Sequence, residues 1–530
     1  MRRWNGWGDE AVSFALPPSI VRYLESVIGP GHPAADAPFD RVVAAIGNSR
    51  LAPADTVSTD AADRLCHARG QSLPDWVAMR SGCIDSFPDG VAYPSSAEDV
   101  QTLFTYARNS GARIIPFGGG TSVVGHISPR TEDAPVLTAD LSRLNQLVTL
   151  DETSRLATFG AGVNGPALES QLVRHGYTLG HYPQSWELST LGGWVVTRSS
   201  GQQSYHYGRI EDLFAGGHIE TPAGPLDLPA LPASAAGPDL RQMILGSEGR
   251  FGILTSATVR VRELPEVETF HGIFFHDWLS GADAVREIAQ AGIPVSMLRL
   301  SDAQETETTL HLSGKDRLIG WANRGLNALG YRGDRSLLIL GVTGDRAGAK
   351  FAYRAATAIA RRHGGTVAIP TIGKTWQKNR FRAPYLRNTL WDAGYAIDTL
   401  ETAVRWSKVA PTALAIKGAI RQAFEALNRR VLVFAHLSHV YTDGASIYVT
   451  YLWPLSPDPQ QTLEGWRAVK SAASNVVVAQ GGTISHQHGV GMDHAPYLKA
   501  EKGAIGVRMI EAVRAALDPD RMMNPGKLID

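Results

Sequence analysis

The pattern of apolar and polar positions predicts short helices at the start of the chain and a denser mixture of strands and helices after residue 88. Apolar positions spaced for small amphipathic helices occur over 21–28 and 39–45. Ser95 and Glu98 have the spacing of a capping box, so a longer helix is expected to begin there and to end at Gly111.

Runs typical of strands alternate with turns up to about residue 262, and a second mixed region follows Pro265. The predicted strands lie at 113–116, 134–137, 157–159, 213–219, 253–261, 269–275, 295–300, 337–341 and 445–452. The predicted helices of these two regions lie at 166–175, 282–291, 347–363, 465–480 and 505–517. This order predicts two mixed domains behind a helical N-terminal extension.

Length and charge narrow the class of protein. A chain of 530 residues is too long for one compact core, and its 44% hydrophobic and 19% charged residues are ordinary for a globular protein. The 51 Lys and Arg residues balance the 51 Asp and Glu residues, which argues against a basic nucleic-acid binder.

Cysteine usage and the absence of long apolar runs indicate the compartment. Cys66 and Cys83 are too few for a disulfide framework and lack the spacing of a zinc site or a redox pair. No run reaches the ~18 consecutive apolar residues of a membrane span. The two arginines at the start are not followed by the apolar segment of a secretory signal. We therefore expect a soluble cytoplasmic enzyme, with peripheral membrane contact left open.

The first chemical signal is a glycine-rich loop, PFGGGTSVVG, over 116–125. Three successive glycines let the backbone approach a ligand without a side-chain clash, and consecutive N–H groups can hold a pyrophosphate. The loop is neither a G-x-G-x-x-G fingerprint nor a P-loop. Taken alone, it fits a tight turn without a ligand equally well.

Two further segments have related compositions. Residues 183–201 are dense in Ser, Thr and Gly, and residues 245–254 read LGSEGRFGIL and run into a predicted strand. Hydroxyl groups can bind phosphates or a flavin ring, and glycine admits a flat ring. An ordinary Ser/Gly loop is the alternative for each segment on its own.

In this order, GGGTS, STLGG and GSEGxxGIL resemble the vanillyl-alcohol-oxidase-type (PCMH-type) FAD-binding domain over about residues 88–262. Segments 4–8, 198–201, 207–212, 299–302 and 485–491 further resemble the alkyldihydroxyacetone-phosphate synthase family, also called alkylglycerone-phosphate synthases, over most of the chain. The resemblance implies an α+β fold, with a two-part PCMH-type FAD-binding domain and an α/β substrate (cap) domain behind the helical extension. The expected ranges are 1–87 for the extension, 88–262 for the FAD-binding domain, 263–480 for the cap domain, and 481–530 for a C-terminal segment that contributes to the active site and packs back on the FAD-binding domain.

The resemblance also implies an activity. The family exchanges the acyl group of acyl-dihydroxyacetone phosphate for a long-chain fatty alcohol and so makes an ether lipid precursor. In the family mechanism the flavin N5 forms an adduct with C1 of the substrate, without net redox. The implied cofactor is non-covalent FAD, the implied partners are these two substrates, and a homodimer is expected.

The FAD contacts implied by the resemblance fall in four stretches of the chain. They are Pro116, Phe117, Gly118, Gly119, Gly120, Thr121 and Ser122; Gln184, Ser185, Ser189 and Thr190; Thr197, Arg198, Ser199 and Ser200; and Ser247, Glu248, Gly249, Gly252, Ile253 and Leu254.

The implied catalytic tyrosine is Tyr448, in the segment GASIY. A phenol with an ordinary pKa of ~10 is a weak base at neutral pH, so the site has to assist it. The resemblance assigns Arg387 to the substrate phosphate, which suits the planar fork of a guanidinium. It places Arg299 in the active site as well, in catalysis and substrate binding.

Histidines complete the implied catalytic set: His181, His486 and His488. The family has three histidines in a row, and here Gln487 replaces the middle one. A glutamine can form hydrogen bonds but does not exchange a proton at neutral pH. If the middle histidine were indispensable, ether synthesis would not follow.

Two other uses of histidine are weighed and set aside. His436, His439, His486 and His488 could form a metal set, but the carboxylate that related metal-dependent dehydrogenases place before the last of them is absent, so no metal is expected. His126 follows the glycine loop away from the usual position of covalent flavin attachment.

Two alternatives to the transferase remain open. One is an FAD-dependent oxidase or dehydrogenase acting on a hydroxy acid or alcohol, and the other is a flavin-binding scaffold without catalysis, because one fold hosts several chemistries. Residues 318–326 could line a tunnel for a long chain, face a membrane, or form a plain core helix.

Overall fold

A small sheet positions the glycine-rich loop. This computed structural model describes residues 2–130, 134–312, 331 and 333–529. The first sheet contains β1 (Val57–Ser58), β2 (Gly90–Ala92), β4 (Val136–Asp140) and β3 (Arg113–Phe117), in that order. β2 and β3 both run parallel to β4. Helix α5 (Ala97–Ser110) leads into β3, so residues 118–120 leave the carboxyl end of a strand, where α/β sheets bind ligands.

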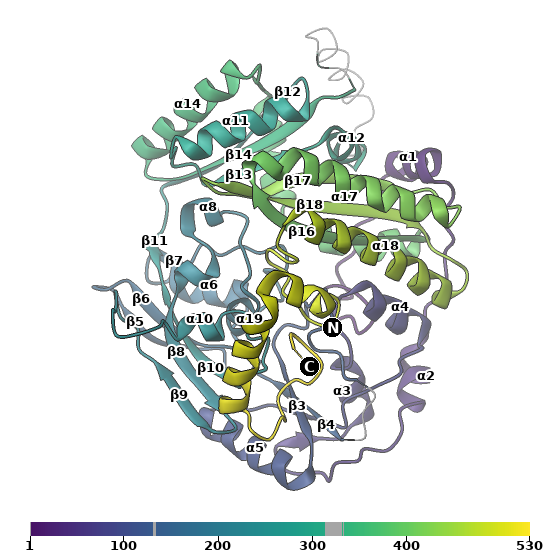
Figure 1. The fold of residues 1–530 in the computed structure, drawn as a ribbon, viewed down its shortest axis with the longest axis vertical. Helices are drawn as coiled ribbons and strands as arrows, with labels where there is room; N and C mark the ends of the chain where they lie inside the picture. Colours follow the sequence, from purple (N-terminus) through teal and green to yellow (C-terminus); the bar gives the residue numbers. More distant parts are fainter. Residues whose placement is uncertain (1, 131–133, 313–330, 332, 530) are drawn as a thin grey trace.

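A second sheet forms the other half of this region (Figure 1). Its strands are antiparallel and run in the order β5 (Leu147–Asp151), β6 (Leu156–Gly160), β10 (Ile253–Arg260), β8 (Phe214–Thr221) and β9 (Gly224–Leu228). Its core includes side chains of α6 (Gly165–Val173) and α7 (Leu191–Thr197). Shorter elements between these strands are β7 (Tyr177–Thr178), α8 (Ser204–Tyr207), α9 (Ile210–Leu213), α10 (Arg241–Ile244) and β11 (Arg262–Glu263).

The largest sheet, here called the cap sheet, lies in the region predicted as the substrate domain. Within the described residues it has seven strands, in the order β15 (Thr366–Val367), β12 (Val267–Phe275), β14 (Ser336–Gly344), β13 (Met297–Ser301), β17 (Leu432–Val440), β18 (Gly444–Pro454) and β16 (Tyr395–Arg405). All its strand pairs are antiparallel, so the sheet is not of the parallel kind that alternating α/β units form.

Helices cover the cap sheet and carry its apolar core. They are α11 (Trp278–Gln290), α12 (Ala303–Leu312), α14 (Arg346–Arg362), α15 (Pro370–Asn379), α16 (Ala383–Asp392), α17 (Trp406–Ala426) and α18 (Pro459–Gln480). The core that α11, α14, α16, α17 and α18 share with the sheet also takes in Trp7, Trp76 and Met79 from the start of the chain. The N-terminal segment is therefore built into the cap.

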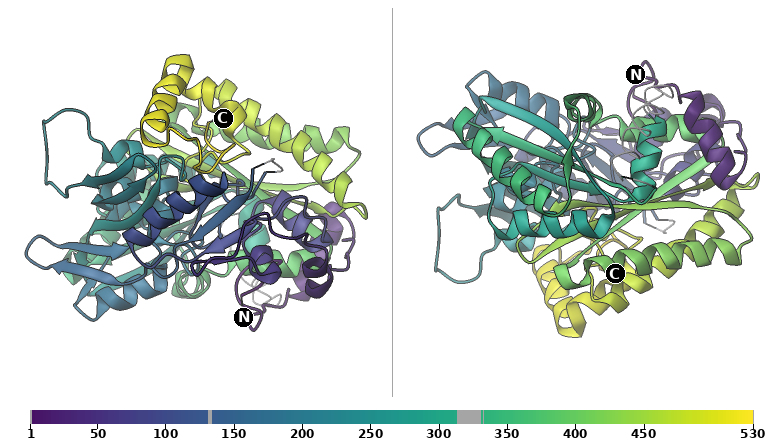
Figure 2. Two further views of the ribbon diagram at one scale, coloured as in Figure 1. Left: turned by 90° about the horizontal axis from the view of Figure 1, so that it is seen from below. Right: turned by 90° about the horizontal axis from the view of Figure 1, so that it is seen from above.

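The N-terminal and C-terminal segments pack on the sheets described above. The N-terminal helices are α1 (Pro18–Ile28), α2 (Phe39–Ala44), α3 (Ala61–Cys66) and α4 (Leu73–Ser81). The last helix, α19 (Ala495–Leu517), has a kink at Gly503, and the chain then returns to β3, where Ile114 donates its N–H to Met522. Figure 2 shows the N-terminus and the C-terminus on opposite sides of the molecule.

Most of the predicted elements are present, with differences at their ends. The capping residue of α5 is Ser96, which accepts the N–H of Asp99, so the prediction of Ser95 was one residue early. Gly111 ends this helix in a left-handed conformation, as predicted. Residues 318–326 lie outside the described residues. Among the described helices, none is long and apolar enough to span a membrane.

Candidate active site

The first two predicted cofactor segments meet directly. A Cβ added to Gly119 would lie 1.9 Å from the carbonyl oxygen of Leu188, and one added to Gly118 would lie 2.4 Å from Oγ1 of Thr190. Gly120 has a φ of +63°, a left-handed value that favours glycine. Only glycines therefore fit where the loop after β3 packs on the start of α7.

The third segment joins them from β10. A Cβ on Gly249 would lie 3.0 Å from the ring of Pro116, and a Cβ on Gly252 would lie 2.4 Å from the carbonyl oxygen of Glu220. Ile253 and Leu254 are buried core residues of β10. In the part of the chain that the structure describes, no group accepts a hydrogen bond from the amides of residues 118–120. Three glycine-lined segments that meet around the free amide donors of residues 118–120 suit the pyrophosphate of FAD, so the residues fit the cofactor.

Many of the predicted cofactor hydroxyls have partners within the protein. Ser189 accepts from the indole N–H of Trp194 at 2.7 Å, Thr190 caps α7, and Thr197 donates to the carbonyl of Gly193 at 2.8 Å. Ser122 bonds to Nδ1 of His126 at 2.8 Å. These side chains shape the segments, which leaves the amides of residues 118–120 as donors for a ligand.

Glu248 and Arg198, two charged residues of the predicted cofactor set, connect the segments to neighbouring loops. The carboxylate of Glu248 accepts the N–H groups of Val490 and Gly491 and lies 3.2 Å from Nε2 of His126. Arg198 donates to the carbonyl of Leu245 at 3.0 Å. Both side chains tie loops together, and Glu248 joins the FAD-binding region to the C-terminal segment.

Arg2 is a cation beside the glycine loop that the sequence analysis missed. Its guanidinium donates to the carbonyl of Gly119 and lies 5.9 Å from the ring centre of Phe117. Gln184, by contrast, turns to the carbonyl of Arg380 at 2.8 Å, so it contacts the segment before α16.

The predicted catalytic side chains lie on one face of the cap sheet. Tyr448 of β18 is directly opposite His436 of β17 on one side and Glu401 of β16 on the other. Residues directly opposite each other in antiparallel strands point to the same face. Register therefore sets an imidazole, a phenol and a carboxylate in one row.

Tyr448 is packed between two imidazoles. Its ring stacks on His436 with centroids 5.0 Å apart and meets His488 edge-on at 5.5 Å, and its hydroxyl donates to Oγ1 of Thr399 at 3.1 Å. Burial raises the pKa of Tyr448 above its ordinary value. The phenol is therefore protonated at neutral pH, which makes it a proton donor at rest.

Arg299 extends the row at its other end. It donates to Glu305 at 2.7 Å and to Oγ of Ser301 at 2.9 Å, and His436 lies 3.1 Å from the same carboxylate. Burial alone would raise the pKa of Glu305, but Arg299 and His436 outweigh it, so the pKa lies below its usual range. Glu305 thus stays ionised and holds Arg299 in place.

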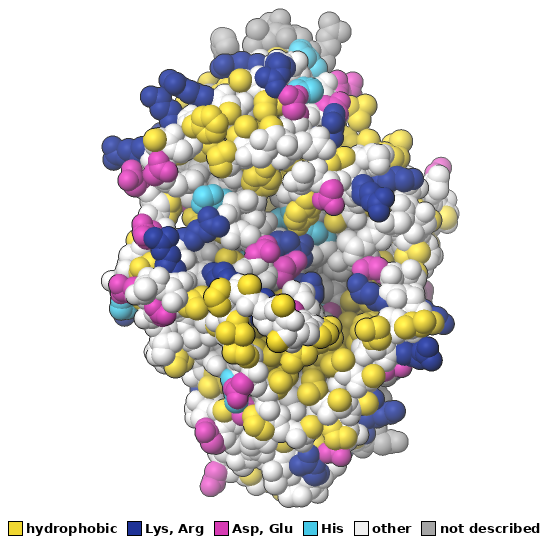
Figure 3. Space-filling view, turned by 60° about the vertical axis from the view of Figure 1, so that its left-hand side comes forward, with side chains coloured by type: hydrophobic (Ala, Val, Ile, Leu, Met, Phe, Trp, Pro, Cys, Tyr) yellow, Lys and Arg dark blue, Asp and Glu magenta, His cyan; other side chains and the backbone are white. Residues whose placement is uncertain are grey.

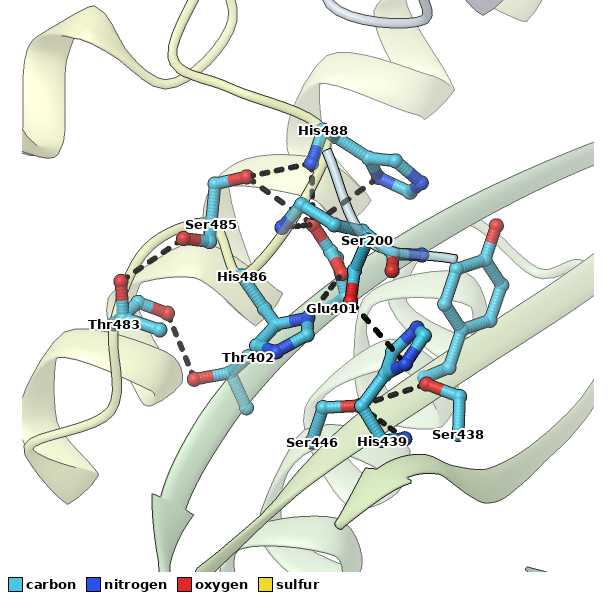
Figure 4. Close-up of polar contacts among 12 residues, drawn as sticks. Ser200, Glu401, Thr402, Ser438, His439, Ser446, Thr483, Ser485, His486 and His488 are labelled. Atoms are coloured by element: carbon cyan, nitrogen blue, oxygen red, sulfur yellow. Dashed lines mark hydrogen bonds and ion pairs between the residues drawn. The ribbon is translucent and has the colours of Figure 1, made fainter. Parts of the chain in front are cut away.

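Glu401 organises the loop that carries the predicted histidines. Its Oε1 accepts the N–H groups of Gln487 at 2.7 Å and His488 at 2.8 Å, and the hydroxyl of Ser485 at 3.1 Å (Figure 4). Its side chain is 0% exposed. No motif in the sequence marks this residue, because the groups that it binds lie more than 80 positions away.

His486 has protein partners on both sides. Arg209 and Tyr441 each donate to its Nε2 at 2.6 Å. Because Arg209 has no acceptor, Nε2 carries no proton and the ring proton is on Nδ1, which faces Glu401 at 3.7 Å. Burial lowers the pKa of His486, and Arg209 adds to this. No site role was predicted from the sequence for Arg209, Tyr441 or Glu401.

The row continues into the FAD-binding region through His439. Its ring stacks on His486 at 5.0 Å, and its Nδ1 contacts the hydroxyl of Ser200 at 3.3 Å. The neighbouring Ser199 bonds to Nε2 of His181 at 2.7 Å. Burial lowers the pKa of His181 to about 3, so this imidazole is neutral at physiological pH. The structure thus brings all five predicted catalytic residues into one connected region.

The buried guanidinium of Arg387 has more N–H donors than the described residues have acceptors for it. It lies 4.5 Å from the ring centre of Trp76 and donates one N–H to the carbonyl of Gln71. Among the described residues, nothing accepts from its Nε or Nη2, although both atoms are buried. Burial lowers its pKa to about 10, with Asp398 and Asp75 acting in the opposite direction. Such donors need an acceptor, and the described residues supply none to these two atoms.

Figure 3 shows a hollow on one face of the molecule, with acidic, basic and histidine side chains inside it and apolar side chains around it. No group of three or more His, Cys, Asp or Glu residues within the described part is arranged to hold a metal ion.

Comparison with known families defines the class first. The family described as "FAD linked oxidases, C-terminal domain" matches residues 264–528, and the family described as "FAD binding domain" matches residues 88–226. These matches and the glycine-lined segments define an FAD-dependent enzyme. The starts of the FAD-binding domain at 88, of the cap domain at 263 and of the C-terminal segment at 481 stay predictions.

Relatives then give the family. An alkyldihydroxyacetonephosphate synthase of Trypanosoma brucei brucei is 30% identical, over 90% of this chain and 78% of that protein. One of Dictyostelium discoideum is 28% identical, over 99% of this chain and 93% of that protein. A solved alkyldihydroxyacetonephosphate synthase structure superposes with a TM-score of 0.85 at 26% identity, over 99% and 98% of the two chains. The chain belongs to the alkyldihydroxyacetonephosphate synthase family, as its motifs predicted.

Proposed function

We propose that the protein exchanges the acyl group of acyl-dihydroxyacetone phosphate for a fatty alcohol. The bond between C1 and the acyl oxygen breaks, a bond between C1 and the alcohol oxygen forms, and the alcohol proton leaves with the fatty acid. No electrons are gained or lost overall. FAD, held by the three glycine-lined segments, supplies the covalent chemistry at C1.

The observation that carries the proposal is the buried arginine. Arg387 has two buried donor nitrogens without a partner among the described residues, and the electrostatic interaction between its guanidinium and the Tyr448 phenol lowers the pKa of Tyr448 in part. A phosphate oxygen pair matches the planar fork of a guanidinium. This supports a phosphorylated substrate with its phosphate on Arg387 and its reacting carbon near Tyr448.

Tyr448 is proposed to handle the proton. Its protonated phenol donates to the departing acyl oxygen and takes the proton of the incoming alcohol. His488, which lies against the phenol ring, and Arg299 at the other end of the row stabilise charge during the exchange. His486 and His181 are held by protein partners, which favours a positioning role for both.

The test uses purified flavoprotein with oxygen and other electron acceptors excluded. Acyl-dihydroxyacetone phosphate and a fatty alcohol are supplied, and the ether product and the free fatty acid are measured by mass spectrometry. The proposal expects both products in equal amounts. Free fatty acid without ether would contradict it.

The second candidate is an FAD-dependent oxidase or dehydrogenase of a hydroxy acid or alcohol. The family match to FAD-linked oxidases favours it, since it covers the cap region as well. Such an enzyme needs an electron acceptor, and its flavin would bleach when the substrate alone is added without air. Bleaching by a hydroxy acid, with no ether formed, would select this candidate.

We propose further that the protein acts in the cytoplasm as a homodimer with peripheral membrane contact. The long apolar chains of both substrates, which partition into membranes, support this. Sedimentation with phosphatidylcholine vesicles tests the membrane contact, and the molecular mass in solution tests the homodimer. A monomer that stays in the supernatant would contradict both.

A further inference from the structure

Glu401 is a buried carboxylate with more contacts to the site than any proposed role explains. One oxygen, Oε1, accepts from two backbone amides and one hydroxyl of the loop 485–488. The two imidazoles of that loop lie on either side of the carboxylate, with His486 Nδ1 3.7 Å from Oε2 and His488 Nδ1 3.6 Å from Oε1. Figure 4 shows Glu401 between these groups.

The carboxylate is kept ionised by the same contacts. Burial raises the pKa of Glu401, but His488, His486 and the amide of Gln487 outweigh burial, so the pKa lies well below its usual range. A buried anion is stable only when it is paired and hydrogen-bonded. The loop conformation and the charge of Glu401 therefore depend on each other.

Strand register places this anion relative to Tyr448. Glu401 of β16 and Tyr448 of β18 are cross-strand partners, and His488 contacts both of them. A carboxylate that holds the Nδ1 side of an imidazole fixes the orientation of its ring and stabilises its protonated form. The opposite ring edge of His488 is then available to the reacting groups.

We propose that Glu401 is the positioning residue of this active site, which faces the Nδ1 edge of His488 and so holds the orientation of its ring against Tyr448. The inference rests on the proposed function for its kinetic consequence. Its structural part, the coupling of Glu401 to His488, stands on geometry alone.

Titratable and charged groups from several elements face the His488 imidazole. They come from the strands of the cap sheet, from α18, from the loop after β3 and from the start of α19: Glu401, Asp398, Tyr448, Lys470, His126 and His494. Burial lowers the pKa of His488 most, and Lys470 and His126 lower it further. Glu401 is the largest opposing influence, so removing its charge should lower the pKa of His488.

The test replaces Glu401 by Gln, which keeps the shape and an acceptor oxygen but removes the charge. Asp518→Asn is the matched control, since Asp518 is also buried and accepts the backbone N–H groups of Met522 and Met523, away from the row. For Glu401→Gln we expect kcat to fall about 100-fold or more with little change in KM. The His488 ring signals in an NMR titration should shift to a midpoint lower by about 1 pH unit or more. The control should change neither.

Glu401→Asp keeps the charge on a shorter side chain and should restore part of kcat and of the His488 titration. If the Gln variant does not bind flavin, the Glu401→Asp variant is used for the test instead. A Gln variant with normal kcat, or one with reduced kcat and an unchanged His488 titration, would overturn the proposal. If the wild-type protein makes no ether, the proposed function fails, while the titration still decides the coupling of Glu401 to His488.

Discussion

The cofactor segments and the cap sheet build two halves of one site in opposite ways. In the cofactor segments, glycines bring the backbone close, and most of the hydroxyl side chains bond within the protein. On the cap sheet, charged and aromatic side chains from neighbouring strands form the row of Tyr448, His436 and Glu401. The first half recognises its ligand through amides, and the second provides ionisable groups. Substitutions should therefore separate binding of flavin from turnover.

The largest effect is expected from Gly119→Ala. The new methyl would lie 1.9 Å from the carbonyl oxygen of Leu188, so the backbone has to move and the flavin should be lost with all activity. Gly418→Ala in α17 is the control, because nothing lies within 4 Å of its added Cβ. Flavin absorbance of the purified variants measures this, and a yellow Gly119→Ala protein with normal flavin content would break the comparison.

Tyr448→Phe should have the opposite pattern. It removes the phenol hydroxyl and its bond to Thr399, and we expect kcat to fall by about 100-fold or more while flavin stays bound. The control is Tyr331→Phe, which removes a buried hydroxyl that bonds to Thr366 elsewhere in the cap. Full activity of Tyr448→Phe would remove the phenol from the mechanism.

Arg387→Ala should weaken binding of the phosphorylated substrate. Hydrogen bonds to a charged group contribute about 1.5–3 kcal/mol, so the KM for acyl-dihydroxyacetone phosphate should rise by roughly 10- to 100-fold. The KM for the fatty alcohol and the flavin content should change little. Arg382→Ala is the control, since Arg382 lies just before α16 and packs on Phe14. An unchanged KM in Arg387→Ala would exclude a phosphate contact.

The smallest effect concerns stability and pH. The pKa of Glu305 is lowered in the folded protein, so its ionised form stabilises the fold above the unfolded pKa of ~4.3, and this stabilisation is lost as the pH falls. At neutral pH, Glu305→Gln should be about 3 kcal/mol less stable than the wild type, because Arg299 loses its buried partner. Chemical denaturation at pH 7 and pH 3.5 should show the difference narrowing in acid. A difference that is independent of pH would mean that the ion pair does not contribute.

The same comparison explains what the sequence could predict. The glycine loop, the segment before α7 and the start of β10 carry contiguous motifs, so their convergence followed from the resemblance. Glu401 reaches the site through the pairing of distant strands, and no motif in the sequence marks it or Tyr441. Arg209 lies in the segment 207–212 that carries the family resemblance, but its contact with His486 is 277 positions away in the chain. The antiparallel order of the cap sheet was missed for the same reason, since strand pairing depends on contacts far apart in the chain.

The charged side chains of the cofactor segments show another limit. Glu248 and Arg198 stand inside flavin motifs, yet their side chains bind the C-terminal segment and the loop before β10. A motif predicts which segments meet, but a side chain within it can serve the packing of that segment. The free amides that suit a flavin phosphate are those of residues 118–120, in the first segment.

The most direct test of the account counts ether molecules made per bound flavin with every electron acceptor excluded. If the two halves form one site for exchange without net redox, the wild-type protein should make many ether molecules per flavin and end with its flavin oxidised. Ether formation that stops at one per flavin, or turnover that requires an electron acceptor, would contradict the account.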